Sequence, residues 1–159
     1  MLKSNNIKKG FTIIEVIIVL VIAAIIMVMV FLVVPQLQQS QRNTKRQNYA
    51  RQVLAAVNQF YANSPSGNLS QTEIENITSA QKDPTTNTTY TITFQNSGAT
   101  LASLAQNNIK VAFANATCST SGNDFASGSG YAVIIATEPF TTAGGATNGV
   151  KYCVTDAKI

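Results

Sequence analysis

The sequence predicts an α+β protein in which one long N-terminal helix packs on a small antiparallel β-sheet. Three observations lead to this prediction. An uninterrupted apolar run lies near the N-terminus, a stripe of apolar residues at helical spacing follows it, and the second half of the chain contains segments in which apolar and polar residues alternate. Because a helix and a sheet each have an apolar face to bury, packing the two together gives a two-layer domain.

The apolar run extends from Val16 to Val34, and none of its nineteen residues has a polar side chain. This length reaches the threshold of about 18 residues at which a run is interpreted as a membrane-spanning helix. Thr12 is placed to cap the first helical turn. Glu15 directly precedes the run, where a carboxylate is unfavourable unless it reaches the headgroups or meets a partner.

Residues 1–10 are polar and basic and end in Gly10. An ordinary secretory signal has its apolar segment before the small residue at which it is cleaved. Here the glycine comes first, so cleavage after it would leave the apolar helix on the mature protein. The alternative is that residues 1–10 form an uncleaved cytoplasmic tail.

The segment KKGFTIIEV, from Lys8 to Val16, together with the apolar run that follows it, resembles the type IV prepilin signature. For this family, the resemblance implies cleavage between Gly10 and Phe11 by a membrane-embedded aspartyl prepilin peptidase. It also implies N-methylation of Phe11, polymerisation through the apolar helix, and pairing of Glu15 with the new amino terminus of a neighbouring subunit. The alternative for Glu15 is an acid of the first turn that the helix dipole stabilises.

The helix is predicted to continue beyond the apolar run. Pro35 lacks a backbone donor, so a kink is predicted there, but the polar residues after it are good helix formers. An apolar stripe at helical spacing follows, formed by Ala50, Val53, Leu54, Val57 and Tyr61. A segment rich in helix breakers, residues 63–68, ends the helix. A single helix from Phe11 to about Ala62 would be about 78 Å long.

Four basic residues lie on this second part of the helix, namely Arg42, Lys45, Arg46 and Arg51. The commoner arrangement for such a cluster is a solvated helix face. The alternative is contact with phosphate groups, either of lipids or of DNA.

The rest of the chain is predicted to form the sheet. Strands are predicted at residues 89–94, 109–113, 131–137 and 150–155. The third has an unbroken apolar centre, which predicts burial on both faces. A short helix is expected within residues 71–81 and a hairpin loop from Thr141 to Gly149, whereas Leu101 to Ala105 fits either a strand or a helical turn.

Cys118 and Cys153 both follow the membrane run, and an even number of cysteines in a domain outside the cell predicts one disulfide bond. Two buried thiols are the alternative. Two cysteines cannot fill a tetrahedral metal site, and the chain has no histidine, so neither a metal nor a catalytic dyad is expected. No glycine pattern of a nucleotide-binding loop occurs, and no cofactor is expected.

The formal charge of +4 gives little support for a nucleic-acid partner. Three of the eleven basic residues lie in the first ten positions, so the remainder carries eight basic and seven acidic residues. A charge of +1 without the leader does not make a broad surface for nucleic acid.

These observations predict a structural subunit of a type IV pilus-like extracellular filament, and no enzyme. By the resemblance, its partners are identical subunits, the prepilin peptidase, and the pilus assembly platform with its ATPase motor. The expected parts are a leader at residues 1–10, a transmembrane and assembly helix at 11–35, an amphipathic helix at 36–62, and a globular head with the C-terminal disulfide region at 63–159.

The precursor is expected to be a single-pass protein of the cytoplasmic membrane with its C-terminal domain outside. Basic residues flank both ends of the apolar run, so this orientation follows from the expected disulfide and the resemblance rather than from charge. Two alternatives remain open. A pseudopilin of a type II secretion or DNA-uptake system has the same N-terminal signature, and a single-pass anchored binding protein would retain residues 1–10.

Overall fold

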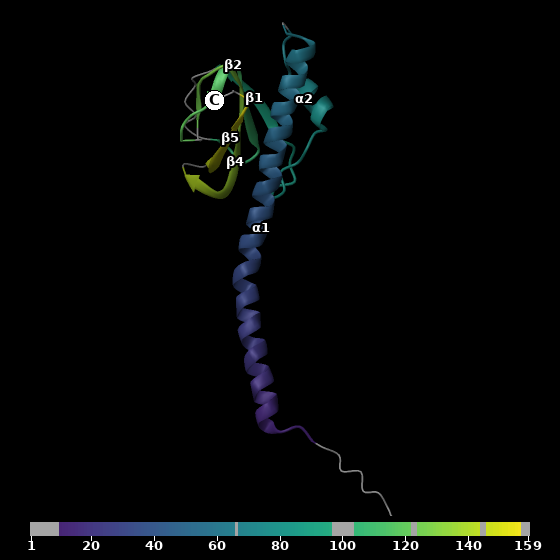
Figure 1. Cartoon of the computed structure of the whole chain (residues 1–159), viewed down its shortest axis with the longest axis vertical. Helices are drawn as coiled ribbons and strands as arrows, with labels where there is room; N and C mark the ends of the chain where they lie inside the picture. The colour runs from purple at the N-terminus through teal and green to yellow at the C-terminus, as the bar shows by residue number, and fades with distance from the viewer. Residues whose placement is uncertain (1–9, 66, 97–103, 122–123, 144–145, 157–159) are drawn as a thin grey trace, which may run out of the picture. The chain divides into compact units, whose positions relative to one another are not determined.

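The computed structural model describes residues 10–65, 67–96, 104–121, 124–143 and 146–156 of the chain. It divides the chain into two compact units, Met1–Gln38 and Gln39–Ile159. Helix α1 (Ile13–Asn63) contributes its first part to one unit and its second part to the other. The elements are labelled in Figure 1.

The described part of the first unit is the N-terminal part of α1 and the three residues before it. The backbone N–H of Glu15 donates a hydrogen bond to Thr12 Oγ1 at 3.4 Å, which confirms the predicted cap. By length and composition, α1 is apolar enough to cross a membrane. It continues through Pro35, so that residue does not end the helix, and the predicted kink stays a prediction.

Among its described residues, the second unit contains a five-stranded sheet in the order β1-β2-β4-β5, with β3 paired to β2. The strands are β1 (Thr91–Asn96), β2 (Asn108–Cys118), β3 (Phe125–Ser127), β4 (Gly130–Ala143) and β5 (Ala146–Thr155). The predicted short helix is α2 (Gln71–Thr78). Ser70 and Glu73 form a capping box that fixes its first turn.

The α+β class is confirmed, but the sheet is mixed rather than wholly antiparallel. Strands β1 and β2 are parallel, with Thr91 opposite Asn108. Residues 97–107 separate these two strands in the sequence, and residues 97–103 of this connection lie outside the described residues. Alternation of apolar and polar residues records which face a side chain occupies, and it carries no information on strand direction.

One further prediction about the sheet was wrong, and one strand was not predicted. The loop predicted from Thr141 to Gly149 belongs largely to strands, because β4 and β5 stay paired as far as Ala143 and Ala146, beyond an irregularity between Thr137 and Thr141. Strand β3 was not predicted, since three residues are too few to establish a period. Of the ambiguous segment from Leu101 to Ala105, residues 101–103 lie outside the described residues, and Leu104 is buried.

Both faces of the sheet are covered. On one face, the second part of α1 packs with its predicted stripe, in which Ala50, Val53, Leu54 and Val57 are buried and Tyr61 is half-buried. Figure 1 shows this part of α1 running alongside the sheet. Strand β4 alternates between two cores: Val133 and Ile135 belong to the cluster beneath α1, and Ala132 and Ile134 to a second cluster. The predicted burial of this strand on both faces is confirmed.

Candidate processing and assembly site

The site begins with the residues that precede the helix. Gly10 is exposed and lies outside α1, which starts three residues later. A Cβ atom placed on Gly10 would meet no heavy atom within 4 Å. Packing among the described residues therefore does not require glycine at this position.

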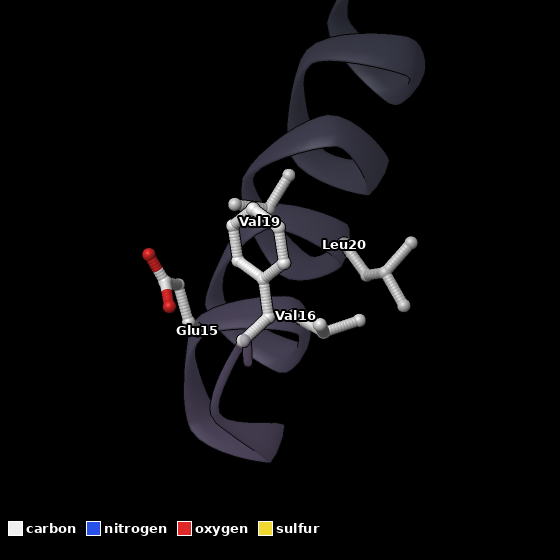
Figure 2. A pocket seen from close by; sticks show the side chains of 5 residues that line it. Glu15, Val16, Val19 and Leu20 are labelled. Atoms are coloured by element: carbon white, nitrogen blue, oxygen red, sulfur yellow. The ribbon is translucent and has the colours of Figure 1, made fainter. Parts of the chain in front are cut away.

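Phe11, which precedes α1, and Glu15, in the first turn of α1, line the same shallow hollow, together with Val16, Val19 and Leu20. Phe11 is 85% exposed. Figure 2 shows the Glu15 side chain directed away from Leu20, with its carboxylate free of the apolar side chains around it. An aromatic ring and a carboxylate are thus presented together at the start of an apolar helix.

The Glu15 carboxylate lies in the first turn of α1, where the unpaired backbone N–H groups give the helix a positive end. It forms no ion pair with any residue that the structure describes. The dipole stabilises an exposed acid there by about 0.3–1 kcal/mol, which leaves the carboxylate available to a cation from outside the chain.

The apolar surface that follows is not covered by any residue in the described part of the chain. The large apolar side chains from Val16 to Val34 are 41–71% exposed. Water is a poor solvent for a surface of this extent, because burial of apolar area contributes roughly 25 cal/mol for each Å². Lipid or other helices must cover it.

Comparison with known proteins identifies the motif in this region. The prokaryotic N-terminal methylation motif, a family model, matches residues 5–31. This is the type IV prepilin signature, and it includes Gly10, Phe11 and Glu15. No curated protein and no solved structure matches the chain.

The chain therefore carries a prepilin-type N-terminus. The motif supports a processed protein of the type IV pilin or pseudopilin kind, and proteins of this kind are structural rather than enzymatic. An apolar helix at this end of the chain is consistent with a membrane-anchored precursor.

The other predicted site residues lie in separate places. Pro35 is inside α1, and Cys118 and Cys153 form a disulfide with a Cα–Cα distance of 5.8 Å. The bond joins the end of β2 to β5, and Cys153 packs against the second core cluster. Among the described residues, no group of three or more His, Cys, Asp or Glu side chains is arranged to hold a metal ion.

The basic cluster of α1 is only in part the solvated face that its sequence suggested, because Lys45 and Arg51 are exposed, whereas Arg42 is half-buried and Arg46 is buried. Arg46 is fully buried and donates to Asp83 at 2.8 and 3.1 Å and to Glu138 at 2.9 Å. Arg42 donates two hydrogen bonds of 2.7 Å to the carboxylate of Glu138. Arg51 donates to the hydroxyl of Tyr152. The three arginines are therefore occupied within the chain.

This network changes the acidity of both carboxyl groups. Burial alone would raise the pKa of Asp83, but hydrogen bonds from Arg46 and from the backbone N–H groups of Thr85 and Thr86 outweigh it and lower the pKa to about 2. The hydrogen bonds from Arg42 lower the pKa of Glu138 to about 2. Both carboxylates therefore remain ionised at neutral pH, inside or at the edge of the core.

Asp83 and Glu138 were not recognised in the sequence as partners of these arginines. One signal was present: Arg46 lies four residues before Ala50 and so extends the buried stripe by one turn. An arginine on the buried side of a helix requires a buried acid. Which acid it meets depends on tertiary contacts over 37 and 92 residues of sequence.

Proposed function

We propose that this chain is the structural subunit of a type IV pilus-like filament. Prepilin peptidase cleaves the precursor between Gly10 and Phe11, the new amino terminus is methylated, and the subunits then assemble through α1. The observation that carries the proposal is the fixed register of glycine, aromatic residue and acid at the start of an apolar helix that no described residue covers.

The apolar helix supports both the membrane-anchored state and the assembled state. As a precursor, the run from Val16 to Val34 lies in the lipid of the cytoplasmic membrane and the second unit lies outside. Leaving lipid for water is strongly unfavourable for such a surface, so extraction is tolerable only when the helices of neighbouring subunits cover one another at the same time. The assembly platform and its ATPase motor supply the work of extraction.

Glu15 gives the assembly its register. Cleavage creates a positively charged amine on Phe11. This amine can pair with the Glu15 carboxylate of a neighbouring subunit when the two groups lie at the same depth in the fibre. Among packed apolar helices the effective dielectric constant is low, so the attraction is stronger than in water, although desolvation offsets part of it. Subunits displaced along the fibre axis would leave both charges unpaired, which disfavours wrong registers.

Gly10 also favours processing, because packing within the described residues does not require a glycine at this position. The chain would accommodate a side chain there, so a requirement for Gly10 would arise from the peptidase that binds this segment. An uncleaved anchored protein has no comparable reason to place glycine before the aromatic residue.

Mass spectrometry of the N-terminal peptide from protein isolated from its host tests processing. A peptide that begins with methylated Phe11 supports the proposal. A peptide that still contains residues 1–10 supports the anchored binding protein instead.

The role of Glu15 is tested by the variant Glu15→Val, compared with Glu73→Gln as a control that removes an acid of α2. Membrane insertion of Glu15→Val should equal that of the wild type, because the substitution makes the helix more apolar, whereas filaments should be reduced at least about tenfold. Normal filaments from Glu15→Val would contradict the pairing.

The pilin is distinguished from the pseudopilin by the size of the assembly. The disulfide-closed C-terminal region, Cys118 to Cys153, favours the pilin. Long surface fibres that an antibody against this chain decorates along their whole length would support it, and a short assembly confined to the cell envelope would support the pseudopilin.

A further inference from the structure

A polar hollow lies in the second unit, between α1 and the segment that follows α2. Its volume is about 240 Å³, below the range of about 300–1,000 Å³ that accommodates drug-sized ligands. Lys45 lines it from α1, and Lys82 lines it from the facing segment. Both lysines are exposed, and neither forms a salt bridge with a described residue.

No acid among the described residues lines this hollow. The nearby network does not neutralise the two lysines, because its two arginines already balance Asp83 and Glu138. Glu75 is close enough to influence the buried Tyr49 but does not line the hollow. The hollow therefore has two lysine side chains that no acid among the described residues compensates.

Two of the three amide side chains of the hollow, Asn48 and Gln52, keep donors for a ligand, whereas Gln81 uses its NH₂ within the hollow and keeps its Oε1 as an acceptor. Asn48 Oδ1 accepts a hydrogen bond from Arg51, which has no acceptor of its own, so the amide NH₂ of Asn48 remains for a ligand. Gln52 Oε1 accepts from Gln81, which likewise leaves the NH₂ of Gln52. A group that satisfies this lining must bring several acceptor oxygens and negative charge.

The walls of the hollow are held in place before any ligand binds. Tyr49 and Tyr90 are buried beneath it, with ring centroids 5.1 Å apart. The backbone of Lys82 pairs with Thr89, and the backbone N–H of Asp83 donates to the carbonyl of Thr88. A preorganised site loses less entropy on binding than a flexible one.

We propose that this hollow binds a phosphate group, through the ammonium groups of Lys45 and Lys82 and the amide donors between them. Phosphate is favoured over carboxylate because no free guanidinium is present for the planar, two-point recognition that suits a carboxylate. Lysine acts as a point charge and accommodates a tetrahedral group with oxygens in several directions. The phosphate is either a free ion or an ester of a larger molecule.

The test uses the full chain in a non-ionic detergent at low salt and neutral pH. Inorganic phosphate and glycerophosphoglycerol, a soluble phosphodiester, are titrated separately, and binding is followed by broadening of the ³¹P resonance. The variants are Lys45→Gln and Lys82→Gln, and Lys110→Gln is the matched control because it removes a lysine that lies outside the hollow. Near-ultraviolet circular dichroism verifies that each variant keeps its fold.

Each hollow variant should weaken binding about fivefold, as expected for the loss of one exposed charge contact, while Lys110→Gln should leave it unchanged. Added sodium chloride should weaken binding to the wild type through screening. Lysine-dependent binding of inorganic phosphate identifies a free ion, and lysine-dependent binding of the diester alone identifies an ester. Binding that is unchanged in Lys45→Gln and Lys82→Gln, or no binding of either probe, overturns the proposal.

Discussion

Arg46 carries a full charge at a position with no exposed surface. Its guanidinium donates to Asp83, Glu138, Asn43 and Thr85, so that every side of the group is occupied. Residues distant in sequence, from α1, from the segment after α2 and from β4, therefore meet at one cation. Such a group is favourable only while its partners are present, because desolvation opposes each charge separately.

The substitution Arg46→Met should destabilise the second unit by about 3–5 kcal/mol, because it leaves Asp83 buried without a cation. Thermal unfolding of the full chain, followed by the near-ultraviolet circular dichroism of its tyrosines, should show a melting temperature lower by at least about 10 °C. The double variant Arg46→Met with Asp83→Asn should recover part of the loss. Equal melting temperatures for the wild type and Arg46→Met would contradict this account of the network.

The same network predicts a loss of stability in acid. The pKa values of Asp83 and Glu138 are about 2 in the folded chain, below their ordinary values of 3.8 and 4.5. A carboxyl group with a lowered pKa in the folded state stabilises it fully above its unfolded pKa, and this contribution declines as the pH falls toward the folded pKa. The melting temperature should therefore decrease between about pH 4.5 and pH 2 on account of this pair.

The variant Glu138→Gln separates this effect from general acid unfolding. It removes one of the two shifted groups, so its melting temperature should depend less steeply on pH over the same interval. If its pH dependence equals that of the wild type, Glu138 does not contribute to the acid transition.

At this scale the sequence predicted the residues whose roles are local, and it did not predict those whose roles depend on folding. Thr12 caps a turn three residues away, and its hydrogen bond to Glu15 is the expected one. The buried stripe from Ala50 to Val57 follows from helical spacing alone. The partners of Arg46 are set by how the sheet meets the helix, which no local spacing encodes.

Among the elements, β2 and β5 are joined by the Cys118–Cys153 disulfide although β4 lies between them in the sheet. The register of β2 shifts between Ala112 and Ala116, and the end of the strand pairs with β3. The second core cluster includes residues of β2, β3 and β4, and Cys153 packs against it. The disulfide therefore stabilises an irregular part of the sheet.

Replacing both cysteines by alanine should lower the free energy of unfolding by about 4 kcal/mol, on the loop-entropy account for a separation of 35 residues. Guanidinium unfolding of the full chain measures the difference. The reductant dithiothreitol should lower the midpoint of the wild type and leave that of the variant unchanged. An equal response of both proteins to reductant would show that the disulfide does not stabilise the fold.

Most elements followed from the hydrophobic period, whereas strand pairing and the extension of β4 and β5 toward each other did not. Strands β1 and β4 begin within two residues of the predicted positions, and α1 ends one residue beyond the predicted end. The extension of β4 and β5 beyond their apolar parts depends on backbone pairing between polar residues such as Thr141 and Asn148. Backbone hydrogen bonds are available to any residue except proline, so they leave little trace in the sequence.

For the whole molecule, the two units differ in how far their apolar side chains are buried. The second unit buries its apolar side chains and can be understood as a folded α+β domain. The first exposes nearly all of its apolar side chains, so its structure is complete only with lipid or other chains around it. The pattern of exposure thus supports a surrounding of lipid or other chains, whereas the N-terminal motif supports processing.

Processing can be separated from folding by the variant Gly10→Val. A Cβ atom at this position meets no heavy atom within 4 Å, so the second unit should melt at the wild-type temperature and the apolar helix should still insert. The peptidase, in contrast, should fail to cleave a branched residue at its cleavage site. The expected result is accumulation of membrane-bound precursor that keeps residues 1–10, as measured by the mass of the intact chain, and a loss of filaments.

Asn6→Val is the matched control, because it places the same side chain in the leader away from the bond to be cleaved, and it should be processed. Normal processing of Gly10→Val would show that Gly10 is not read by a peptidase, and it would remove the main support for cleavage at this position.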